Sequence, residues 1–172
     1  MFIDEAGFYL LPSVVRTYAP RGHTPVLESW LTYDHLSVMS GITMAGQLYT
    51  WVREQALNSF DSVRFLKHLS HQLHRRVLVI WDGSPIHRKE VTAFLTSGGA
   101  KHMHLEQLPA YAPDLNPDEG VWHYLKRVEL RNLCCKSLSH LRRELNLAVH
   151  RLRNKPQLIQ SFFEGAGLSI EV

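Results

Sequence analysis

The stretch Val77-Leu78-Val79-Ile80-Trp81 is an unbroken apolar run, and Asp82 follows it directly. A short apolar run of this kind is typical of a strand that is buried on both faces in the middle of a sheet. In open α/β sheets, ligand sites lie at the carboxyl ends of such strands. The stretch therefore predicts a central strand and makes Asp82 a candidate site residue.

Helical and extended patterns alternate on both sides of this strand. Upstream, apolar residues recur every three or four positions over 60–73, which predicts an amphipathic helix capped by Ser59 or Asp61. Downstream, the pattern predicts, in order, a helix over 88–95, a strand over 103–108, a proline-rich loop over 109–117, a helix over 118–130, and a long last helix that Ser137 or Ser139 caps and Pro156 kinks or ends.

The first third of the chain has a different pattern. Three extended segments, 2–10, 36–44 and 47–52, are separated by turn signals and predict an antiparallel meander. A meander followed by helix–strand alternation is the pattern of one α/β domain with a mixed central sheet flanked by helices. We therefore expect residues 1–172 to form a single domain.

Length and composition exclude several classes of protein. The chain has 172 residues, of which 45% are hydrophobic and 20% charged, as in ordinary globular domains. The two cysteines, Cys134 and Cys135, are adjacent, which excludes a disulfide framework and favours a reducing cytosol. No apolar run approaches the roughly 18 residues of a membrane helix, and the first residues do not resemble an export signal. We expect a cytoplasmic protein with no membrane partner.

Positive charge is concentrated in the last part of the chain. Between Gly120 and Lys155, nine basic residues stand against two acids, so this stretch carries +7 and the rest of the chain −4. Such a basic helical segment, about 120–160, suggests an anionic polymer as partner, although a solvated helix face has the same composition. The residues expected to contact this polymer, which the resemblance described below implies is DNA, are Lys126, Arg127, Arg131, Arg142, Arg143, Arg151 and Arg153.

Three carboxylates stand at unusual places. Asp4 lies in an otherwise apolar first strand, Asp82 ends the apolar run, and Glu119 falls in the first turn of a helix. If the first and fourth strands are neighbours, Asp4 and Asp82 project from the same edge, and the helix brings Glu119 to them. Because clustered carboxylates repel each other, we expect a hard cation, Mg²⁺ or Mn²⁺. Two such ions about 4 Å apart support phosphoryl transfer, with Asp4 bridging them.

Each of these carboxylates also has a simpler explanation. An aspartate at a strand end, such as Asp82, is most often a cap or turn residue. A glutamate in a first helical turn, such as Glu119, complements the helix dipole. Asp4, next to Glu5, also fits an exposed strand end. The residue types alone leave the question open, and the surrounding sequence decides it.

Four stretches surround these acids. They read Phe-Ile-Asp-Glu-Ala-Gly-Phe (2–8), Arg-Thr-Tyr-Ala-Pro-Arg-Gly-His-Thr-Pro (16–25), Val-Ile-Trp-Asp-Gly-Ser-Pro-Ile-His-Arg (79–88) and Leu-Pro-Ala-Tyr-Ala-Pro-Asp-Leu-Asn-Pro-Asp-Glu-Gly-Val-Trp-His-Tyr-Leu-Lys (108–126). In this order and at these separations, they resemble the catalytic domain of IS630-type insertion-sequence transposases, within the Tc1/mariner superfamily. The resemblance runs from Phe2 to about Arg153, and the last stretch is the most specific.

The resemblance implies a ribonuclease-H-like fold and a DDE metal site, in which Asp4, Asp82 and Glu119 match the three acids. It implies hydrolysis of a phosphodiester at each element end with Mg²⁺ or Mn²⁺, followed by attack of the freed 3′-hydroxyl on target DNA. The implied partners are double-stranded DNA and, in the active form, further copies of the chain, in a bacterial cytoplasm beside the nucleoid. The family carries helix-turn-helix modules ahead of this domain, and we expect that module to be absent here.

The third acid has a rival. Asp118 stands where the family has an aliphatic residue, and relatives with three aspartates make it a second candidate for this ligand. We favour Glu119, because it stands in the Asn-Pro-x-Glu register of the family motif, and because Asn116 and Pro117 suit the N-cap and the first helical position. Asp118 then complements the helix dipole, and the longer Glu119 reaches the metals.

The second acid also lies in a stretch that departs from the family pattern. Gly83-Ser84 replace the usual Asn-Ala after Asp82, which loosens the loop that positions it. His87 is an accessory candidate, which touches the scissile phosphate, orients a water or only caps a helix.

Other chemistries have less support. The histidines include His102-x-His104, but no Cys-x-x-Cys or His-Glu-x-x-His frame completes a zinc site. No phosphate-binding Gly-Lys-[Ser/Thr] loop exists, so ATP use is not expected. Two rival functions remain open, a ribonuclease-H-like nuclease that cuts without joining, and a catalytically defective DNA-binding remnant.

Overall fold

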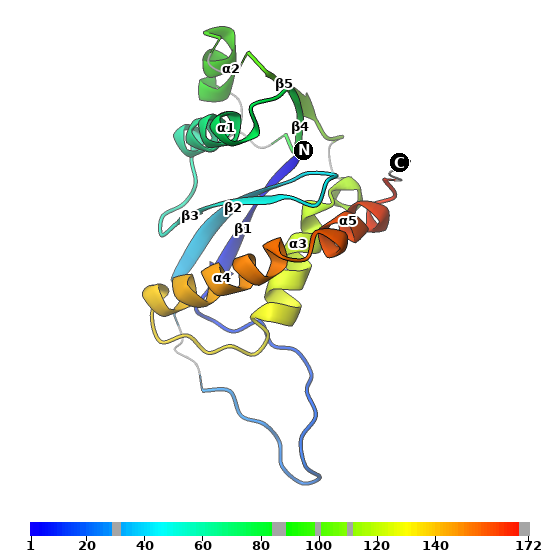
Figure 1. Ribbon diagram of the computed structural model, residues 1–172. Helices are drawn as coiled ribbons and strands as arrows, with labels where there is room; N and C mark the ends of the chain where they lie inside the picture. Colours follow the sequence, from blue (N-terminus) through cyan, green and yellow to red (C-terminus); the bar gives the residue numbers. More distant parts are fainter. Residues whose placement is uncertain (29–31, 84–88, 99–100, 110–111, 169–172) are drawn as a thin grey trace.

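The computed structural model describes residues 1–28, 32–83, 89–98, 101–109 and 112–168. Within these residues, five strands form one mixed sheet in the order β3-β2-β1-β4-β5 (Figure 1). Their bounds are β1 Phe2–Tyr9, β2 His35–Ile42, β3 Leu48–Arg53, β4 Val77–Trp81 and β5 Met103–Gln107. The first three strands pair antiparallel, while β1–β4 and β4–β5 pair parallel. The predicted mixed α/β sheet is confirmed.

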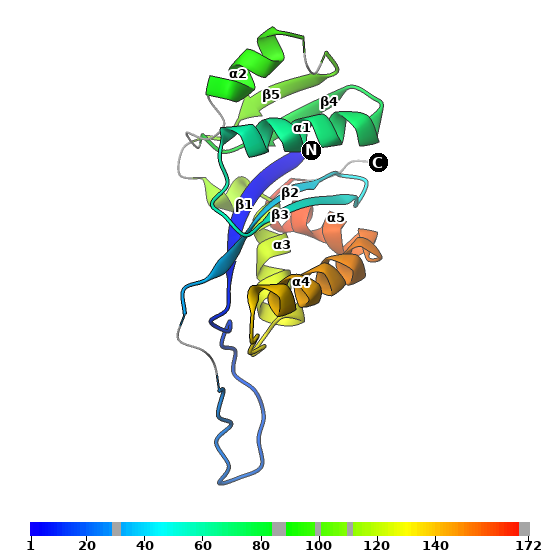
Figure 2. The same cartoon turned by 90° about the vertical axis from the view of Figure 1, so that its left-hand side faces the viewer.

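Helices cover both faces of this sheet (Figure 2). On one face lie α3, α4 and α5, and on the other lies α1, with α2 beside it. Along β1, Phe2 and Phe8 belong to the apolar cluster under α3–α5, whereas Ile3 belongs to the cluster under α1. This alternation gives the sheet two packed faces. The bounds are α1 Ser59–Leu73, α2 Lys89–Thr96, α3 Asp118–Tyr124, α4 Leu138–Arg153 and α5 Pro156–Gly165.

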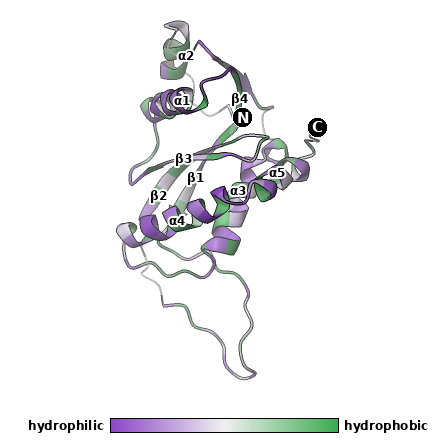
Figure 3. Cartoon of the chain, in the orientation of Figure 1, coloured by the Kyte–Doolittle hydropathy of each residue, from purple (hydrophilic) through white to green (hydrophobic). Residues whose placement is uncertain are grey.

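Two expectations about burial are wrong. Leu78 of β4 is 47% exposed, so this strand is not buried along both faces. The helices α3, α4 and α5 pack against β1 and β2 and leave this part of β4 uncovered. The strand that is buried almost throughout is β2. Phe60 is 62% exposed, because the buried stripe of α1 begins one turn later, with Phe65 and Leu66. Hydrophilic residues are interspersed with hydrophobic ones along the helices (Figure 3).

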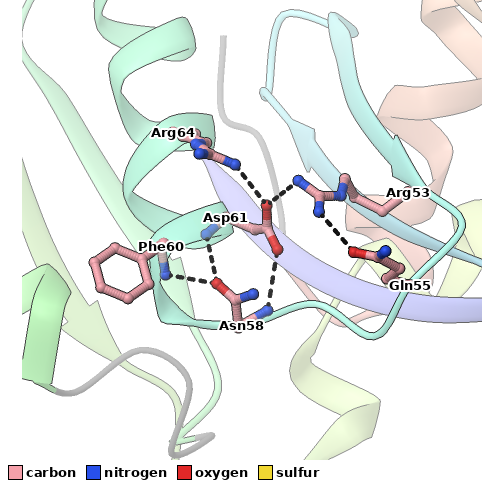
Figure 4. Close-up of polar contacts among 6 residues, drawn as sticks. All are labelled: Arg53, Gln55, Asn58, Phe60, Asp61 and Arg64. Atoms are coloured by element: carbon pink, nitrogen blue, oxygen red, sulfur yellow. Dashed lines mark hydrogen bonds and ion pairs between the residues drawn. The ribbon is translucent and has the colours of Figure 1, made fainter.

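The cap of α1 is Asn58, not Ser59 or Asp61. The Asn58 side chain accepts hydrogen bonds from the backbone N–H groups of Phe60 and Asp61. Asp61 accepts from the Asn58 backbone N–H, which completes a capping box. The Asp61 carboxylate also binds Arg53 at 2.8 Å and Arg64 at 3.6 Å (Figure 4). The network ties the start of α1 to the end of β3.

The segment between β1 and β2 extends away from the body of the molecule as a long loop (Figures 1 and 2). Its base is fixed by Asn132, which exchanges hydrogen bonds with the Val15 backbone. Further out, Tyr18 and Val26 are fully or largely exposed. None of the helices in the described part of the chain combines the length and apolar character needed to cross a bilayer.

The C-terminal helices start largely as the sequence predicts. Asn116 has extended backbone angles, and its side chain accepts a hydrogen bond from the Asp118 N–H, while Pro117 is already helical. After α3, the chain continues as a π-helical turn over Leu125–Glu129. Ser137 caps α4, and Pro156 begins the separate helix α5. The end of the proline-rich loop thus fixes the residue at which α3 begins.

Candidate active site

Asp4 lies in the first half of β1, beside Asp82, which directly follows the carboxyl end of β4. The parallel register pairs Phe2 with Ile80, and each aspartate stands two residues further along its own strand. Side chains two apart point to the same face of a sheet. Both carboxylates therefore lie on the face that α3 covers. The predicted meeting of the two strands is confirmed by this pairing.

Glu5 joins this pair. One carboxylate oxygen from each of Asp4, Glu5 and Asp82 lies within 4.8 Å of the other two, an arrangement that suits a cation. Sequence reasoning missed Glu5, because strand alternation assigns it to the opposite face from Asp4. The adjacency of two acids within the first strand was the available signal. A glutamate is long enough to bring its carboxylate to the shared edge.

Asp4 is held by α3. The Trp122 indole N–H donates a hydrogen bond to Asp4 Oδ2 at 2.9 Å. Burial raises the pKa of Asp4 to about 6, and the charges of Glu5 and Glu119 add to the rise, while the Trp122 hydrogen bond opposes it. The ionised carboxylate is therefore poorly compensated by the protein itself. Trp122 is thus both a member of the apolar core and a polar contact of Asp4.

The two candidates for the third acid have opposite environments. Glu119 is exposed, at the start of α3, and lies outside the Asp4–Glu5–Asp82 group, although its charge raises the pKa of Asp4. Asp118 is fully buried, and its carboxylate accepts a hydrogen bond from the Ser40 hydroxyl. Burial raises the pKa of Asp118 well above its usual range. Glu119 is thus the accessible acid and Asp118 the enclosed one.

A glycine brings another helix close to Glu119. A Cβ atom at Gly120 would lie 2.7 Å from Cγ of Phe162 on α5, which is closer than real Cβ contacts. The absent side chain lets α5 pack against the first turn of α3. The position of Glu119 therefore depends on both the sheet and α5.

The donor set fits a hard divalent cation. Asp4, Glu5 and Asp82 offer only carboxylate oxygens, and no thiolate or imidazole joins them among the described residues. Oxygen donors of this kind suit Mg²⁺ and Mn²⁺. The raised pKa of Asp4 means that its ionised form is destabilised, and a bound cation would stabilise that form.

The family comparison agrees with this geometry. The model of the family described as "DDE superfamily endonuclease" matches residues 1–142 of the chain. The chain belongs to the DDE superfamily of endonucleases. The matched range includes Asp4, Asp82 and Glu119 of this DDE domain. A search of curated proteins finds no match.

Solved structures with the same fold include those of the Mos1 mariner transposase. The Mos1 strand transfer complex aligns with a TM-score of 0.65 at 17% identity, and covers 99% of this chain and 56% of that one. The Mos1 paired-end complex with Mn aligns at 0.63 and 15%, with the same coverages of 99% and 56%. The isolated Mos1 catalytic domain aligns at 0.54 and 14%, covering 99% and 84%. The DDE domain thus spans little more than half of the Mos1 chain in the complexes.

Lys126 differs from the other basic residues of the DDE domain. Burial lowers the pKa of its ammonium, while the charges of Glu119 and Asp4 oppose this effect. Its Nζ lies 5.2 Å from the centre of the Phe8 ring. It also lines a cavity of about 220 Å³ with Phe8, Leu130 and Leu141 among its walls. Lys126 is therefore a half-buried cation beside the carboxylates.

Most of the other predicted DNA contacts already have partners within the chain. Arg142 binds Glu54 at 3.2 Å, Arg151 binds Glu129 at 2.6 Å, and Arg153 donates to the Leu48 carbonyl at 3.0 Å. Arg143 pairs with Glu144 and Arg127 with the Val14 carbonyl, whereas Arg131 is exposed. The pairs of Arg142 with Glu54 and of Arg143 with Glu144 are exposed, and exposed ion pairs contribute little free energy, so phosphates can replace these two acids. His87 lies outside the described residues.

Proposed function

We propose that this DDE domain is the catalytic domain of a DNA transposase of the Tc1/mariner type. The observation that carries the proposal is the parallel register of β1 and β4, which brings Asp4 and Asp82 together beneath the helix that bears Glu119. A family match over residues 1–142 supports endonuclease chemistry, and the fold shared with Mos1 transposase supports transposition.

The acids have distinct roles in this proposal. Asp4, held by Trp122, would be the ligand shared by the Mg²⁺ or Mn²⁺ ions, and Asp82 and Glu119 would each be a ligand of one of them. When bound, the ions supply an activated water and stabilise the leaving oxygen of the phosphodiester. Glu119 is the proposed third ligand because it is exposed, whereas the carboxylate of Asp118 is enclosed and bonded to Ser40. Mos1 has been solved with Mn and with Mg.

DNA is the proposed substrate and partner. The basic residues of α3–α4 would contact phosphates without reading sequence. Lys126 would lie nearest the scissile bond, because the charges of Asp4 and Glu119 act on its ammonium group. The Mos1 paired-end complex supports assembly of several copies on two DNA ends. We place the protein with its substrate, at the bacterial nucleoid in the cytoplasm. Residues 1–172 would act as one catalytic unit, with the basic helices in its C-terminal part.

Substitution at the third acid tests the proposal. With a supercoiled plasmid as substrate and Mn²⁺ present, Glu119→Gln should abolish nicking while leaving DNA binding intact. Asp118→Asn should retain activity within about tenfold, equivalent to about 1.4 kcal/mol in the barrier. The reverse result would assign the third ligand to Asp118.

A joining assay separates the proposal from its rivals. A duplex with the terminal repeat that flanks the coding sequence, ending in a 3′-hydroxyl, should be joined to plasmid DNA in the presence of Mn²⁺. Nicking without joining would identify a nuclease. DNA binding without either reaction would identify a defective remnant.

A further inference from the structure

A buried polar pair links β2 to α3. Ser40 and Asp118 are both 0% exposed, and the Ser40 hydroxyl donates a hydrogen bond to Asp118 Oδ1. The second oxygen, Oδ2, is buried and has no hydrogen-bond partner among the described residues. Burying a carboxyl group in this way costs free energy that a pair of apolar side chains would not require. The pair therefore calls for an explanation beyond packing.

Both members of the pair stand next to proposed metal ligands. Ser40 lies directly opposite Asp4 in the antiparallel register of β1 and β2, so the two side chains share a face. Asp118 immediately precedes Glu119 in the chain. The hydrogen bond thus connects the strand position beside the first acid to the helix position beside the third.

A second contact lies one helical turn away. Trp122, four residues after Asp118, donates its indole N–H to Asp4 Oδ2 at 2.9 Å. Residues four apart share one face of a helix, so the two contacts fix both the shift of α3 along the sheet and its rotation. Glu119 follows Asp118 by about 100° around the helix. Its direction is therefore set once Asp118 and Trp122 are held.

We propose that Ser40 and Asp118 form a positioning pair that holds α3 on β2, so that Glu119 meets the carboxylates of Asp4 and Asp82. Neither residue touches the ion or the DNA. The inference rests on the proposed function, because it assumes that these three acids share a metal site. Displacement of a catalytic group by about 1 Å can reduce a rate by about 100-fold. Loss of the Ser40–Asp118 contact should therefore change the reaction rate more than the stability of the fold.

The test measures how the reaction depends on metal. Plasmid nicking is titrated with Mn²⁺ for wild type, Ser40→Ala, Asp118→Asn and Asp118→Leu, and metal-free melting is recorded for each. Ser37→Ala is the matched control, since Ser37 is a buried serine of the same strand, three positions away and on the other face. Asp118→Asn keeps the volume and an oxygen that accepts from Ser40, while Asp118→Leu keeps only the volume.

We expect Ser40→Ala and Asp118→Leu to raise the Mn²⁺ concentration for half-maximal nicking by about tenfold or more, as for the loss of other supports of metal ligands. Asp118→Asn should stay near wild type, and Ser37→Ala should not change the midpoint. Lower melting temperatures with unchanged midpoints would overturn the positioning role. If Ser40→Ala does not fold, equal midpoints for Asp118→Asn and Asp118→Leu would overturn it as well. Failure of wild type to nick with Mn²⁺ would instead contradict the proposed function itself.

Discussion

Asp4 shows how the site is built at the scale of single residues. Its neighbour on the sheet is Ser40, its hydrogen-bond donor is Trp122, and its carboxylate lies near those of Glu5 and Asp82. Burial and the charges of Glu5 and Glu119 raise the free energy of its ionised form, and the Trp122 hydrogen bond lowers it. The site is therefore under electrostatic strain, which a bound cation would relieve.

This strain predicts that the stability of the metal-free protein depends on pH. The pKa of Asp4 is about 6 in the folded state, against an ordinary 3.8, so the folded state holds the proton more tightly than the unfolded state. Stability should therefore fall as the pH rises from about 4 to about 6. Above that range, Asp4→Asn should be more stable than wild type by about 1–3 kcal/mol, because the amide carries no charge.

Urea denaturation in the presence of a chelator, at pH values from 4 to 8, measures this difference. The buried Asp118 is present in both proteins, and the main cause of its raised pKa, burial, is the same in both. Asp4→Asn and wild type should converge near pH 4. A wild type that gains stability over the variant as the pH rises would contradict the assignment of a raised pKa.

At the scale of elements, hydrophobic periodicity predicts most of the fold. The meander, the helix over 60–73 and the strand over 77–81 follow from residue pattern alone, and each is observed within a few residues. Burial was harder to predict, as the exposed side chains of Phe60 and Leu78 show. An apolar side chain is buried only where another element covers it, and the sequence does not state which element that is.

The same limit applies to the site. The three acids could be selected from the sequence because their surrounding motifs resemble a family, and the register of β1 and β4 supports Asp4 and Asp82. The approach of Glu5 could not be foreseen, since strand alternation argues against it. The contacts of Ser40 with Asp118 and of Trp122 with Asp4 depend on how α3 crosses the sheet, which residue periodicity does not specify.

At the scale of the whole molecule, the helices on the α3–α5 face of the sheet carry the basic segment, and the proposed metal site lies on the same face. A polyanion drawn to this face would be guided towards the acids only when cations neutralise them. Metal and DNA are therefore expected to bind cooperatively.

Replacing Arg142 and Arg143 together with alanine should weaken DNA binding alike for all sequences. Each lost phosphate contact should reduce the slope of log affinity against log salt by about 0.9. Fluorescence anisotropy with two unrelated duplexes, over a range of salt concentrations, measures this slope.

Arg64→Ala is the control for this experiment, because Arg64 lies on α1, across the sheet from the basic segment. A loss of affinity for only one duplex would mean that the arginines read bases. Unchanged affinity and slope would mean that the segment is only a solvated surface.

Thermal melting with and without Mn²⁺ tests the central claim, that the carboxylates form a metal site, most directly. Mn²⁺ at about 100 times its dissociation constant should stabilise the wild type by about 2.7 kcal/mol. Asp82→Asn should lose most of that gain, while Asp114→Asn, which changes an exposed acid outside the cluster, should keep it. An equal gain in wild type and Asp82→Asn would contradict the assignment of these carboxylates as the metal site.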